Sequence, residues 1–595
     1  MKNIVFAVTA FSFFTVSFSQ TNNRLAPRAK TKIDSTYNAL IKKHKVVGAS
    51  LAIVDSGRIV YSMGYGFSDR ENKIPATDKT IFRIGSCTKS FTSLSILQLQ
   101  EKGLLNVNAS VKKYLPELKI SSRFNDSNDI YISDMMCHLS GLPCDIMNGF
   151  FCDSPPDINW VIEELNKQTT ISPRRYKHAY SNIAFGLLGE VIAKQGKTTY
   201  SQYVKNNIFT PLGMNSSYID VDKELEKNYS KAYCFNKPAS EPFIRDQAAG
   251  LIHSTSADMG RYLLMFLNKG EYNGNRIISE ASLKDMESNH IGDAFLPEPE
   301  SWGYGLYSGK VKIKKGSDSS LVTITGHGGD TYSFHSDFAY IPELGVGVIV
   351  LTNTDNGTRV CSATKLLNLY LNSARGYKCA FNQRDTLLNK KNQIVDATCT
   401  AEEIKGTYNF GQFYMKAKGA HKMKFWQGPA KVVLKQKKSD SSRYRVKAFV
   451  FGIIPVKIRD QEMSFVKRGG DIFMKVNHLK SKNVEYIVAK SKAPQIPGSW
   501  KKAYGSYKAV SKLYPCKDCP FANPEGMTMS LREKGGFVTI ALKAKTSDFS
   551  GDTFLDVVDE KLAVGGGIGR GTGETVRMLD NGHIYYSGFE FEKVK

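Results

Sequence analysis

Hydrophobic and polar positions follow two different patterns along the chain. From about residue 25 to residue 380, segments with helical spacing are mixed with segments in which polar and apolar residues alternate. The clearest helical segment carries Phe91, Leu94 and Leu97 at three-residue intervals, and Gly103 follows as a stop signal. This mixture predicts an α+β domain.

Further elements are expected in the same part of the chain. Helices are predicted at 132–141, 181–196 and 359–374, and strand pairs at 47–66, with a turn at Asp55-Ser56-Gly57, and at 335–353, with a turn at Pro342–Gly345.

From about residue 400 the pattern becomes that of an all-β region. Short alternating segments such as 444–452, 484–490 and 536–545 are separated by turns rich in Gly, Pro, Ser and Lys, which is compatible with a barrel. A Gly-x-Tyr opening occurs at Gly406 and again at Gly505. These short matches leave open whether 400–595 is one unit or two modules, 400–492 and 496–595.

The first 19 residues match a secretory signal peptide and are not expected to belong to the fold. Lys2 precedes an apolar run from Ile4 to Val16, and Ser17-Phe18-Ser19 resembles a cleavage site. The run is shorter than the roughly 20 residues that span a bilayer, and no later segment is long and apolar enough to do so. We therefore expect an exported protein without a membrane span, extracellular or, in a bacterium, periplasmic or on the cell surface.

Export makes the ten cysteines candidates for disulfides. The candidates are Cys144 with Cys152, which bracket a short loop, Cys361, Cys379 and Cys399 near the domain junction, and the local pair Cys516 and Cys519. Cys87 and Cys137 fall in predicted buried helices and are expected to be free thiols. Five N-x-S/T sequons would carry glycans in a eukaryotic host, at Asn108, Asn125, Asn215, Asn228 and Asn356.

The formal charge of +25 is concentrated in one part of the chain. Residues 405–510 contain 24 Lys and Arg against 5 Asp and Glu. Such a region can bind a polyanion, for example an acidic polysaccharide of an extracellular matrix. Alternatively, it is a β domain whose outward positions are solvated lysines. No Arg-aromatic motif for nucleic acid is present, so we expect no nucleic-acid partner.

Ser86 and Lys89 form an S-x-x-K element at the start of a predicted buried helix. Residues three apart share a helix face, so the lysine amine can reach the serine hydroxyl. A serine becomes a nucleophile when a neighbouring group accepts its proton, and burial lowers the pKa of a lysine towards that role. Alone the element is weak, because a helix-capping serine with a surface lysine gives the same spacing.

Two further motifs follow in order. Tyr180-Ser181-Asn182 comes just before another buried helix, and His327-Gly328-Gly329 lies on or next to a strand. With the segments 111–118, 131–143, 206–214, 248–268 and 302–306, residues 30–380 resemble the serine β-lactamase and penicillin-binding family. The nearest branch is that of class C β-lactamases, D-aminopeptidases and esterases, the peptidase S12 group. The resemblance implies an antiparallel sheet flanked by helices over 25–380, and a mechanism that needs neither cofactor nor metal.

The resemblance also implies roles for particular residues. Ser86 would form the acyl-enzyme, while Lys89 and Tyr180 would share the proton transfers. Asn182 would hydrogen-bond either the acyl side chain or Lys89. The oxyanion hole would consist of the backbone N–H groups of Ser86 and Asp330. Gly328 and Gly329 would let a substrate backbone lie close to the strand.

His327 departs from the lysine of the lactamase K-T-G motif. Lysine supplies a fixed positive charge for a substrate carboxylate, whereas histidine is mostly neutral at pH 7. The exchange weakens the case for β-lactam hydrolysis and favours an esterase, amidase or aminopeptidase. Asp330 would also disfavour anionic substrates. The sequence E-E-L-N at 163–166 resembles a class A deacylation loop, but its spacing and position are wrong, so it is expected to be helix surface.

Three functions remain open from the sequence. The first is a secreted serine hydrolase acting on an ester, amide or peptide. The second is a non-enzymatic or weakly active extracellular matrix protein that reuses the hydrolase fold, like the gigasin type of mollusc shell. The third is a penicillin-binding enzyme that acts on a bacterial cell wall.

Overall fold

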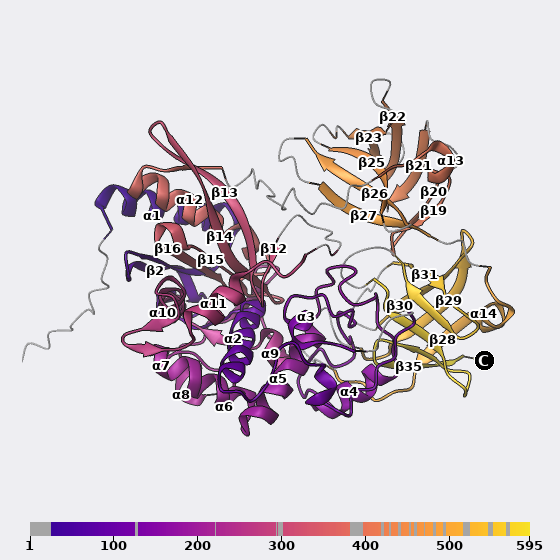
Figure 1. The fold of residues 1–595 in the computed structure, drawn as a ribbon, viewed down its shortest axis with the longest axis horizontal. Coiled ribbons are helices and arrows are strands. Elements are labelled where there is room, and N and C mark those ends of the chain that lie inside the picture. The colour runs from indigo at the N-terminus through magenta and orange to yellow at the C-terminus, as the bar shows by residue number, and fades with distance from the viewer. Residues whose placement is uncertain are drawn as a thin grey trace, which may run out of the picture.

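The computed structural model describes residues 25–594 with some gaps. The gaps are residues 125–128, 221, 293, 295–300, 381–396, 418–421, 428–429, 438–441, 451–453, 457, 459–460, 469–470, 480–483, 492–494, 516–523, 545–550 and 567–571. The predicted signal peptide, the sequon at Asn125 and the pair Cys516 and Cys519 lie outside the described residues. Figure 1 shows the N-terminal domain in indigo through magenta to rose, followed by an orange β-sheet and a yellow β-barrel.

The N-terminal domain is built on an antiparallel sheet in the order β12-β13-β14-β15-β16-β1-β2-β3, with β17 paired to β13. The strands are β1 (Gly48–Asp55), β2 (Arg58–Asp69), β3 (Ile74–Pro75), β12 (Ser301–Trp302), β13 (Tyr307–Lys315), β14 (Asp318–Asp330), β15 (His335–Ile341), β16 (Val346–Thr352) and β17 (Lys378–Cys379). Both expected strand pairs are confirmed. The turn between β1 and β2 uses Ser56 and Gly57 at positive φ, as a tight hairpin requires.

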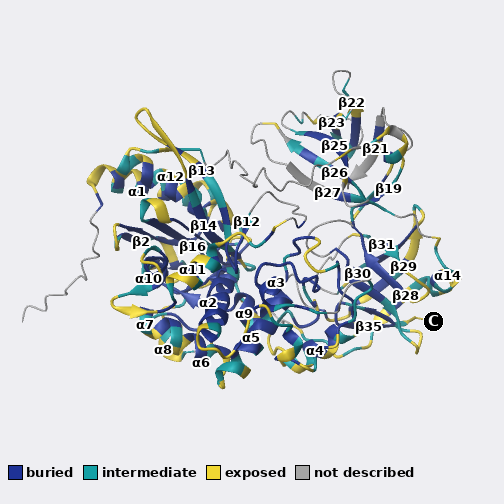
Figure 2. Ribbon diagram, viewed as in Figure 1, coloured by how far each residue is buried: buried dark blue, intermediate teal, exposed yellow. Residues whose placement is uncertain are grey.

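Helices cover both faces of this sheet, so every residue of β1 is buried. The helices are α1 (Pro27–His44), α2 (Thr88–Glu101), α3 (Ile132–Met136), α4 (Ile158–Asn166), α5 (Asn182–Gly196), α6 (Tyr200–Val204), α7 (Thr210–Leu212), α8 (Lys223–Glu226), α9 (Gln247–Gly250), α10 (Ser256–Leu267), α11 (Glu280–Glu287) and α12 (Ala363–Arg375). One core cluster packs α1 and α12 against the sheet, and a larger one contains α2, α5 and α10. The buried colour of α2 marks the centre of this larger core (Figure 2).

The helix expected at 132–141 was predicted too long. It ends at Met136, because His138 and Gly141 both adopt positive φ, at 62° and 74°. A helix cannot continue through such residues. The helix expected at 181–196 is confirmed as α5. The helix expected at 359–374 is α12, but it begins only at Ala363, where the Ser362 side chain caps it.

In its described residues the C-terminal region is all-β apart from two short helices, α13 (Ala401–Ile404) and α14 (Gly498–Ala503), which confirms the expected class. A ten-stranded sheet contains β18 (Ala397–Thr398), β19 (Gly406–Asn409), β20 (Tyr414–Ala417), β21 (Lys422–Gln427), β22 (Ala430–Gln436), β23 (Arg443–Val450), β24 (Ile454–Val456), β25 (Gln461–Arg468), β26 (Asp471–His478) and β27 (Val484–Ser491). A closed barrel follows, with β28 (Gly505–Ala509), β29 (Thr528–Lys534), β30 (Phe537–Lys543), β31 (Thr553–Val557), β32 (Leu562–Gly565), β33 (Thr575–Met578), β34 (Ile584–Tyr586) and β35 (Phe589–Lys593).

The two Gly-x-Tyr segments occupy equivalent corners of these sheets. Each begins a strand that pairs with the last strand of its sheet, β19 with β27 and β28 with β35. In each, the tyrosine hydroxyl donates to the carbonyl four residues earlier, from Tyr408 at 2.9 Å and from Tyr507. The side chain of a lysine from the last strand lies where a Cβ of each glycine would be, Lys490 at Gly406 and Lys593 at Gly505. The short sequence match therefore corresponds to a shared three-dimensional corner.

The barrel packs directly on the N-terminal domain beside α4 (Figure 1). Thr169 N–H donates to Thr575 Oγ1 at 3.1 Å, and Tyr585 Oη donates to the Glu164 carbonyl at 3.1 Å. Asn148 Nδ2 donates to the Gly588 carbonyl at 2.8 Å. These contacts connect residues more than 400 positions apart in sequence, so the barrel becomes part of the surroundings of the N-terminal domain.

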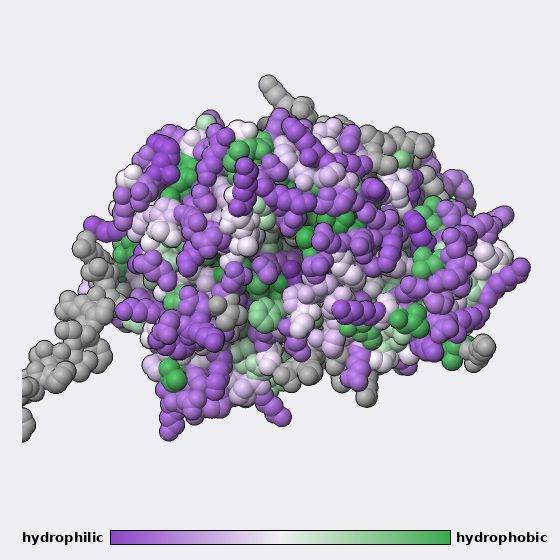
Figure 3. All heavy atoms as spheres, turned by 90° about the horizontal axis from the view of Figure 1, so that it is seen from below, coloured by the Kyte–Doolittle hydropathy of each residue, from purple (hydrophilic) through white to green (hydrophobic). Residues whose placement is uncertain are grey.

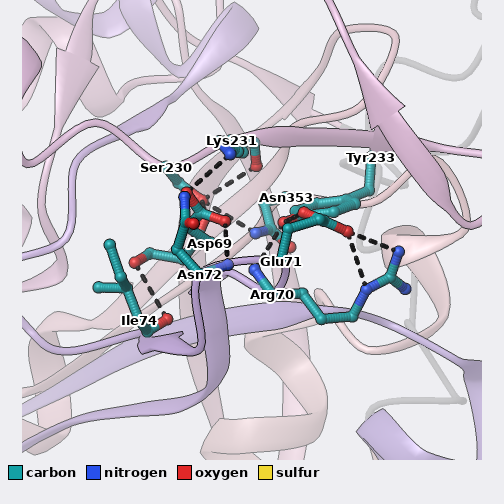
Figure 4. A network of polar contacts seen from close by, with 10 residues as sticks. Asp69, Arg70, Glu71, Asn72, Ile74, Ser230, Lys231, Tyr233 and Asn353 are labelled. Atoms are coloured by element: carbon teal, nitrogen blue, oxygen red, sulfur yellow. Dashed lines mark hydrogen bonds and ion pairs between the residues drawn. The ribbon is translucent and has the colours of Figure 1, made fainter.

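A polar network ties the end of β2 to the strand β6 (Ala232–Cys234), as Figure 4 shows. Lys231 Nζ lies 2.8 Å from Asp69 Oδ2, and this contact holds the pKa of Asp69 at about 2. Tyr233 Oη accepts the N–H of Arg70 and donates to Glu71 Oε2, both at 2.7 Å. The groups satisfy one another, so the network serves to fix this turn.

The disulfides expected near Cys144 and at the domain junction were predicted wrongly. Cys152 is a free thiol that lies 3.2 Å from the Gly149 carbonyl, so it does not pair with Cys144. Cys361 and Cys379 are free as well. Cys87 and Cys137 are buried free thiols, as expected.

Within the described residues, no helix is long and apolar enough to cross a membrane. Figure 3 shows hydrophilic side chains over most of one face of the molecule, with apolar side chains in small separate groups.

Candidate active site

Ser86 lies in a tight turn that leads straight into the central helix. Gly85–Cys87 forms a 3-10 turn, and α2 begins at Thr88. Gly85 has φ 50°, and a Cβ at this position would lie 3.0 Å from Asp330 N. Only glycine allows this backbone to approach β14 so closely. Ser86 is therefore held at the helix start, where it is partly exposed.

Lys89 is fully buried one turn further along, and its amine is surrounded by acceptors. Lys89 Nζ donates to Ser86 Oγ at 3.1 Å and to Asn182 Oδ1 at 2.7 Å. It also donates to the Ala249 carbonyl of α9 at 2.8 Å. A buried ammonium needs such partners. The lysine is thus fixed beside the serine hydroxyl whose proton it would exchange.

Asn182 opens α5 and contributes its amide to the site. Ser181 caps this helix by accepting the Ala184 N–H at 3.0 Å, and its hydroxyl donates to the Pro143 carbonyl at 2.6 Å. Asn182 Nδ2 donates to Asp145 Oδ1 at 2.7 Å. Asp145 was not among the residues singled out from the sequence, because nothing local marks it as a partner of a helix 37 residues later.

Tyr180 stands over the lysine within a group of aromatic rings. Its ring centre lies 4.8 Å from Lys89 Nζ, 4.2 Å from the His138 ring and 6.1 Å from the Trp302 ring. His138 Nδ1 accepts the Ser181 N–H at 3.2 Å. His138 is thus a hydrogen-bonded core residue that also supports Tyr180 directly.

Strand β14 brings the third motif against the nucleophile. A Cβ on Gly329 would lie 2.9 Å from Ser86 N and 2.1 Å from the Ile84 carbonyl oxygen. Cys87 Sγ lies 3.1 Å from the His327 carbonyl and 3.0 Å from Ser336 Oγ, which ties the turn to β14 and β15. The backbones of 85–86 and 329–330 therefore lie side by side, where two N–H groups can face one substrate oxygen.

His327 is buried and uncharged. Burial, followed by the charge of Lys89, lowers the pKa of His327 to about 3. Its Nδ1 lies 2.5 Å from the Gly328 carbonyl, which requires the proton on Nδ1 and leaves a lone pair on Nε2. No hydrogen-bond partner for Nε2 occurs among the described residues. The position that carries lysine in K-T-G motifs is here a neutral acceptor.

Two features lie next to the oxyanion position. The Asp330 carboxylate is 68% exposed and lies 2.5 Å from His335 Nδ1. Tyr332, two residues further, packs on Phe151 with ring centres 4.6 Å apart. The third motif is thus followed by an exposed carboxylate and by an aromatic pair. In the described residues no group of three His, Cys, Asp or Glu side chains could hold a metal ion. The E-E-L-N segment lies at the end of α4 and was expected to be helix surface, which holds for Glu163 only, since Glu164 and Leu165 are buried.

Comparison with known proteins agrees with this geometry. The family model described as Beta-lactamase matches residues 33–371. The chain belongs to the beta-lactamase family. The match contains Ser86, Lys89, Tyr180, Asn182 and His327–Asp330, and leaves the C-terminal sheet and barrel outside it.

Relatives in this family are distant. The chain is 26% identical over 345 residues to Protein flp of Staphylococcus aureus, covering 56% of this chain and 64% of that protein. It is 32% identical over 346 residues to Beta-lactamase-like protein 2 of Dictyostelium discoideum, covering 55% of this chain and 60% of that protein. The chain thus matches less than two thirds of the length of these relatives.

A solved structure shares the fold. The octameric penicillin-binding protein homologue from Pyrococcus abyssi superposes with a TM-score of 0.50 at 22% identity. The alignment covers 78% of this chain and all of that one.

Proposed function

We propose that the protein is a serine hydrolase that cleaves uncharged ester, amide or peptide substrates through an acyl-enzyme on Ser86. The observation that carries this proposal is the position of Lys89. Its amine lies 3.1 Å from Ser86 Oγ, while Asn182 and the Ala249 carbonyl hold it from two other directions. A buried lysine fixed in this way can exchange the serine proton.

The proposed reaction has two steps. Ser86 Oγ bonds to the substrate carbonyl carbon, and its proton passes to the pair formed by Lys89 and Tyr180. The N–H groups of Ser86 and Asp330 stabilise the oxyanion, and the leaving alcohol or amine takes up the proton. Water then attacks the acyl-enzyme with the same groups acting in reverse, which releases the acid and restores Ser86.

The preference for an uncharged substrate follows from His327. Its Nε2 offers a lone pair, which suits a substrate N–H or O–H group and opposes a carboxylate. The exposed carboxylate of Asp330 opposes an anion further. Phe151 and Tyr332 offer an apolar surface. These features support a place in the D-aminopeptidase and esterase branch and weigh against efficient hydrolysis of carboxylate-bearing lactams.

Covalent labelling tests the proposal. The purified protein without residues 1–19 is treated with a fluorophosphonate probe, beside Ser86→Ala and Ser90→Ala. Ser90 lies in the same helix, and its hydroxyl donates to the Cys87 carbonyl at 2.8 Å, so it is the matched control. We expect one adduct in the parent and in Ser90→Ala, and none in Ser86→Ala. A folded parent without an adduct would disprove a working acyl-transfer site.

Export remains part of the proposal and rests on the leader-like residues 1–19. Detection of the chain in the culture medium, periplasm or extracellular matrix of its host, with a new N-terminus near Gln20, would support it. An intracellular protein that keeps Met1 would contradict it.

A matrix role is the second candidate, because 24 basic residues fall within 405–510. We propose that this region binds acidic polysaccharide. Full-length Ser86→Ala protein should bind a sulfated polysaccharide at low salt, and the affinity should fall steeply between about 50 and 200 mM salt. If binding is absent at 50 mM salt, this role is excluded.

A further inference from the structure

A carboxylate from the C-terminal barrel lies directly behind the candidate active site. Glu574, just before β33, is 6% exposed, and its Oε1 accepts the N–H of Cys144 at 3.0 Å. Cys144 belongs to the loop between α3 and α4 of the N-terminal domain. A group 430 positions away in sequence therefore holds one side of this peptide.

The carbonyl group of the same residue holds the second motif. The Cys144 carbonyl accepts the N–H of Asn182 at 2.9 Å. The next residue, Asp145, accepts Asn182 Nδ2 at 2.7 Å, and Asn182 Oδ1 in turn accepts Lys89 Nζ at 2.7 Å. A continuous chain of hydrogen bonds thus runs from the barrel to the amine beside Ser86.

This chain determines which way the Asn182 amide points. An ionised carboxylate can only accept, so Asp145 takes the amide nitrogen and leaves the oxygen for Lys89. If the 144–145 segment moved away, the amide could turn and present its N–H groups to the lysine. Two donors would then face each other, and the amine would lose its fixed direction towards the serine.

The residues just before Glu574 are held closely against the N-terminal domain. Lys177 is buried nearby, and its Nζ donates to Thr572 Oγ1 of the barrel at 3.1 Å. Arg123 donates to the Thr170 carbonyl at 2.7 Å and reaches the Gly573 carbonyl at 3.4 Å. A Cβ on Gly573 would lie 2.8 Å from the Ile171 carbonyl, so the barrel backbone is close packed here.

We propose that Glu574 is a positioning residue for the Ser86 site, acting through Cys144, Asp145 and Asn182 on the direction of Lys89. The inference rests on the proposed hydrolase function, since it assigns the barrel a part in that reaction. The barrel is then a working component of the active site as well as a neighbouring domain.

The test uses the full mature chain and three variants. Glu574→Ala removes the acceptor, Glu574→Gln keeps an oxygen that can accept the Cys144 N–H, and Thr575→Val is the control. Thr575 is the next residue, is fully buried and bonds the N-terminal domain through Thr169, outside the Asn182 chain. For each protein we measure the melting temperature, the maximal fluorophosphonate labelling rate and the probe concentration for half that rate.

We expect Glu574→Ala to lower the maximal labelling rate about 10-fold or more, with the half-saturating probe concentration within twofold. Glu574→Gln should return the rate to within about threefold of the parent, as should Thr575→Val. A parent-like rate in Glu574→Ala would overturn the inference. So would a Glu574→Gln protein as slow as Glu574→Ala, because a general loss of stability would then explain both.

A second readout separates this inference from the proposed function. Amide hydrogen exchange is followed in peptides that cover 143–148 and 181–186. Exchange in both should quicken about 10-fold or more in Glu574→Ala and stay unchanged in Thr575→Val, whether or not Ser86 reacts. If the parent forms no adduct, the hydrolase proposal fails. Unchanged exchange at 181–186 in Glu574→Ala would overturn the positioning role, whatever the labelling result.

If Glu574→Ala does not fold, the partly exposed Asp145 provides the same test one step along the chain. Asp145→Ala should reduce the maximal labelling rate about 10-fold or more without a change in half-saturating concentration. A parent-like rate in that variant would overturn the inference.

Discussion

Gly329 determines how closely β14 can approach the nucleophile, and Gly329→Ala tests this directly. The new Cβ would lie 2.1 Å from the Ile84 carbonyl oxygen, 2.5 Å from Ser336 Oγ and 2.9 Å from Ser86 N. Ser336 can rotate away, but the other two atoms belong to the backbone that carries the nucleophile. The substitution must therefore push β14 and the Ser86 turn apart.

The size of the effect follows from these distances. A carbon and a carbonyl oxygen approach to about 3.3 Å, so the two segments must separate locally by roughly 1 Å. A displacement of that size at a reacting group can cost about 100-fold in rate. Overpacking of a buried site also destabilises by about 1–3 kcal/mol. We expect a labelling rate of Ser86 at least about 100-fold lower and a melting temperature lower by a few degrees.

A glycine on the neighbouring strand β13 supplies the matched control. A Cβ on Gly309 would have its nearest neighbour, Ile324 Cγ2, at 4.0 Å, which is an ordinary contact. Gly309→Ala should therefore keep the labelling rate within about threefold. The assay is the second-order rate of fluorophosphonate labelling, with thermal unfolding measured in parallel. Equal rates and melting temperatures for both variants would refute the close approach of β14 to Ser86.

Three further predictions concern charge at the site and at the barrel. Lys89→Met should reduce labelling about 1000-fold or more and lower the melting temperature by a few degrees, because methionine fills the buried space but leaves Asn182 Oδ1 and the Ala249 carbonyl without their donor; labelling at a parent-like rate would show that Lys89 takes no part. His327→Lys should raise the kcat/KM ratio of a carboxylate substrate over its methyl ester about 10-fold, and an unchanged ratio would contradict the role given to His327. Burial raises the pKa of Glu574 to about 7 from a usual 4.5, with Asp145 adding to and Lys177 opposing the shift. Between about pH 5 and 7 the folded state therefore keeps a proton on Glu574 that the unfolded state has released, so the free energy of unfolding falls as pH rises through this range. This fall in the free energy of unfolding, up to about 3 kcal/mol, should be absent from Glu574→Gln when both proteins are unfolded chemically at several pH values. Identical pH profiles for the two proteins would contradict the buried carboxyl.

Local features of the site could be predicted because they depend on neighbours within one turn of backbone. The three-residue spacing of Ser86 and Lys89 places both on one side of the chain, and the lysine amine does reach the hydroxyl. The turn at Ser56-Gly57 and the start of α5 at Asn182 were predicted for the same reason. In each case backbone geometry and side-chain type act over a few residues only.

The short helix α3 shows where local reasoning ends. Its apolar pattern continues to residue 141, yet His138 adopts positive φ at the point where its ring packs on Tyr180. The chain forms fewer helical hydrogen bonds at this point, and the contacts of the buried His138 ring offset that loss. Cys144 and Cys152 likewise looked like a disulfide pair by spacing, but spacing along a loop does not set the direction of two side chains.

The sequence by itself determined the α+β class, the all-β C-terminal region, and the order and chemistry of the three motifs, because periodicity and residue type carry that information. Only the tertiary structure decided that Asp145 orients Asn182, that His327 is buried with its lone pair unpaired by described residues, and that Glu574 of the barrel supports the same loop. These contacts join residues up to 430 positions apart. No local pattern encodes them, since they exist only once separate hydrophobic cores have folded and packed together.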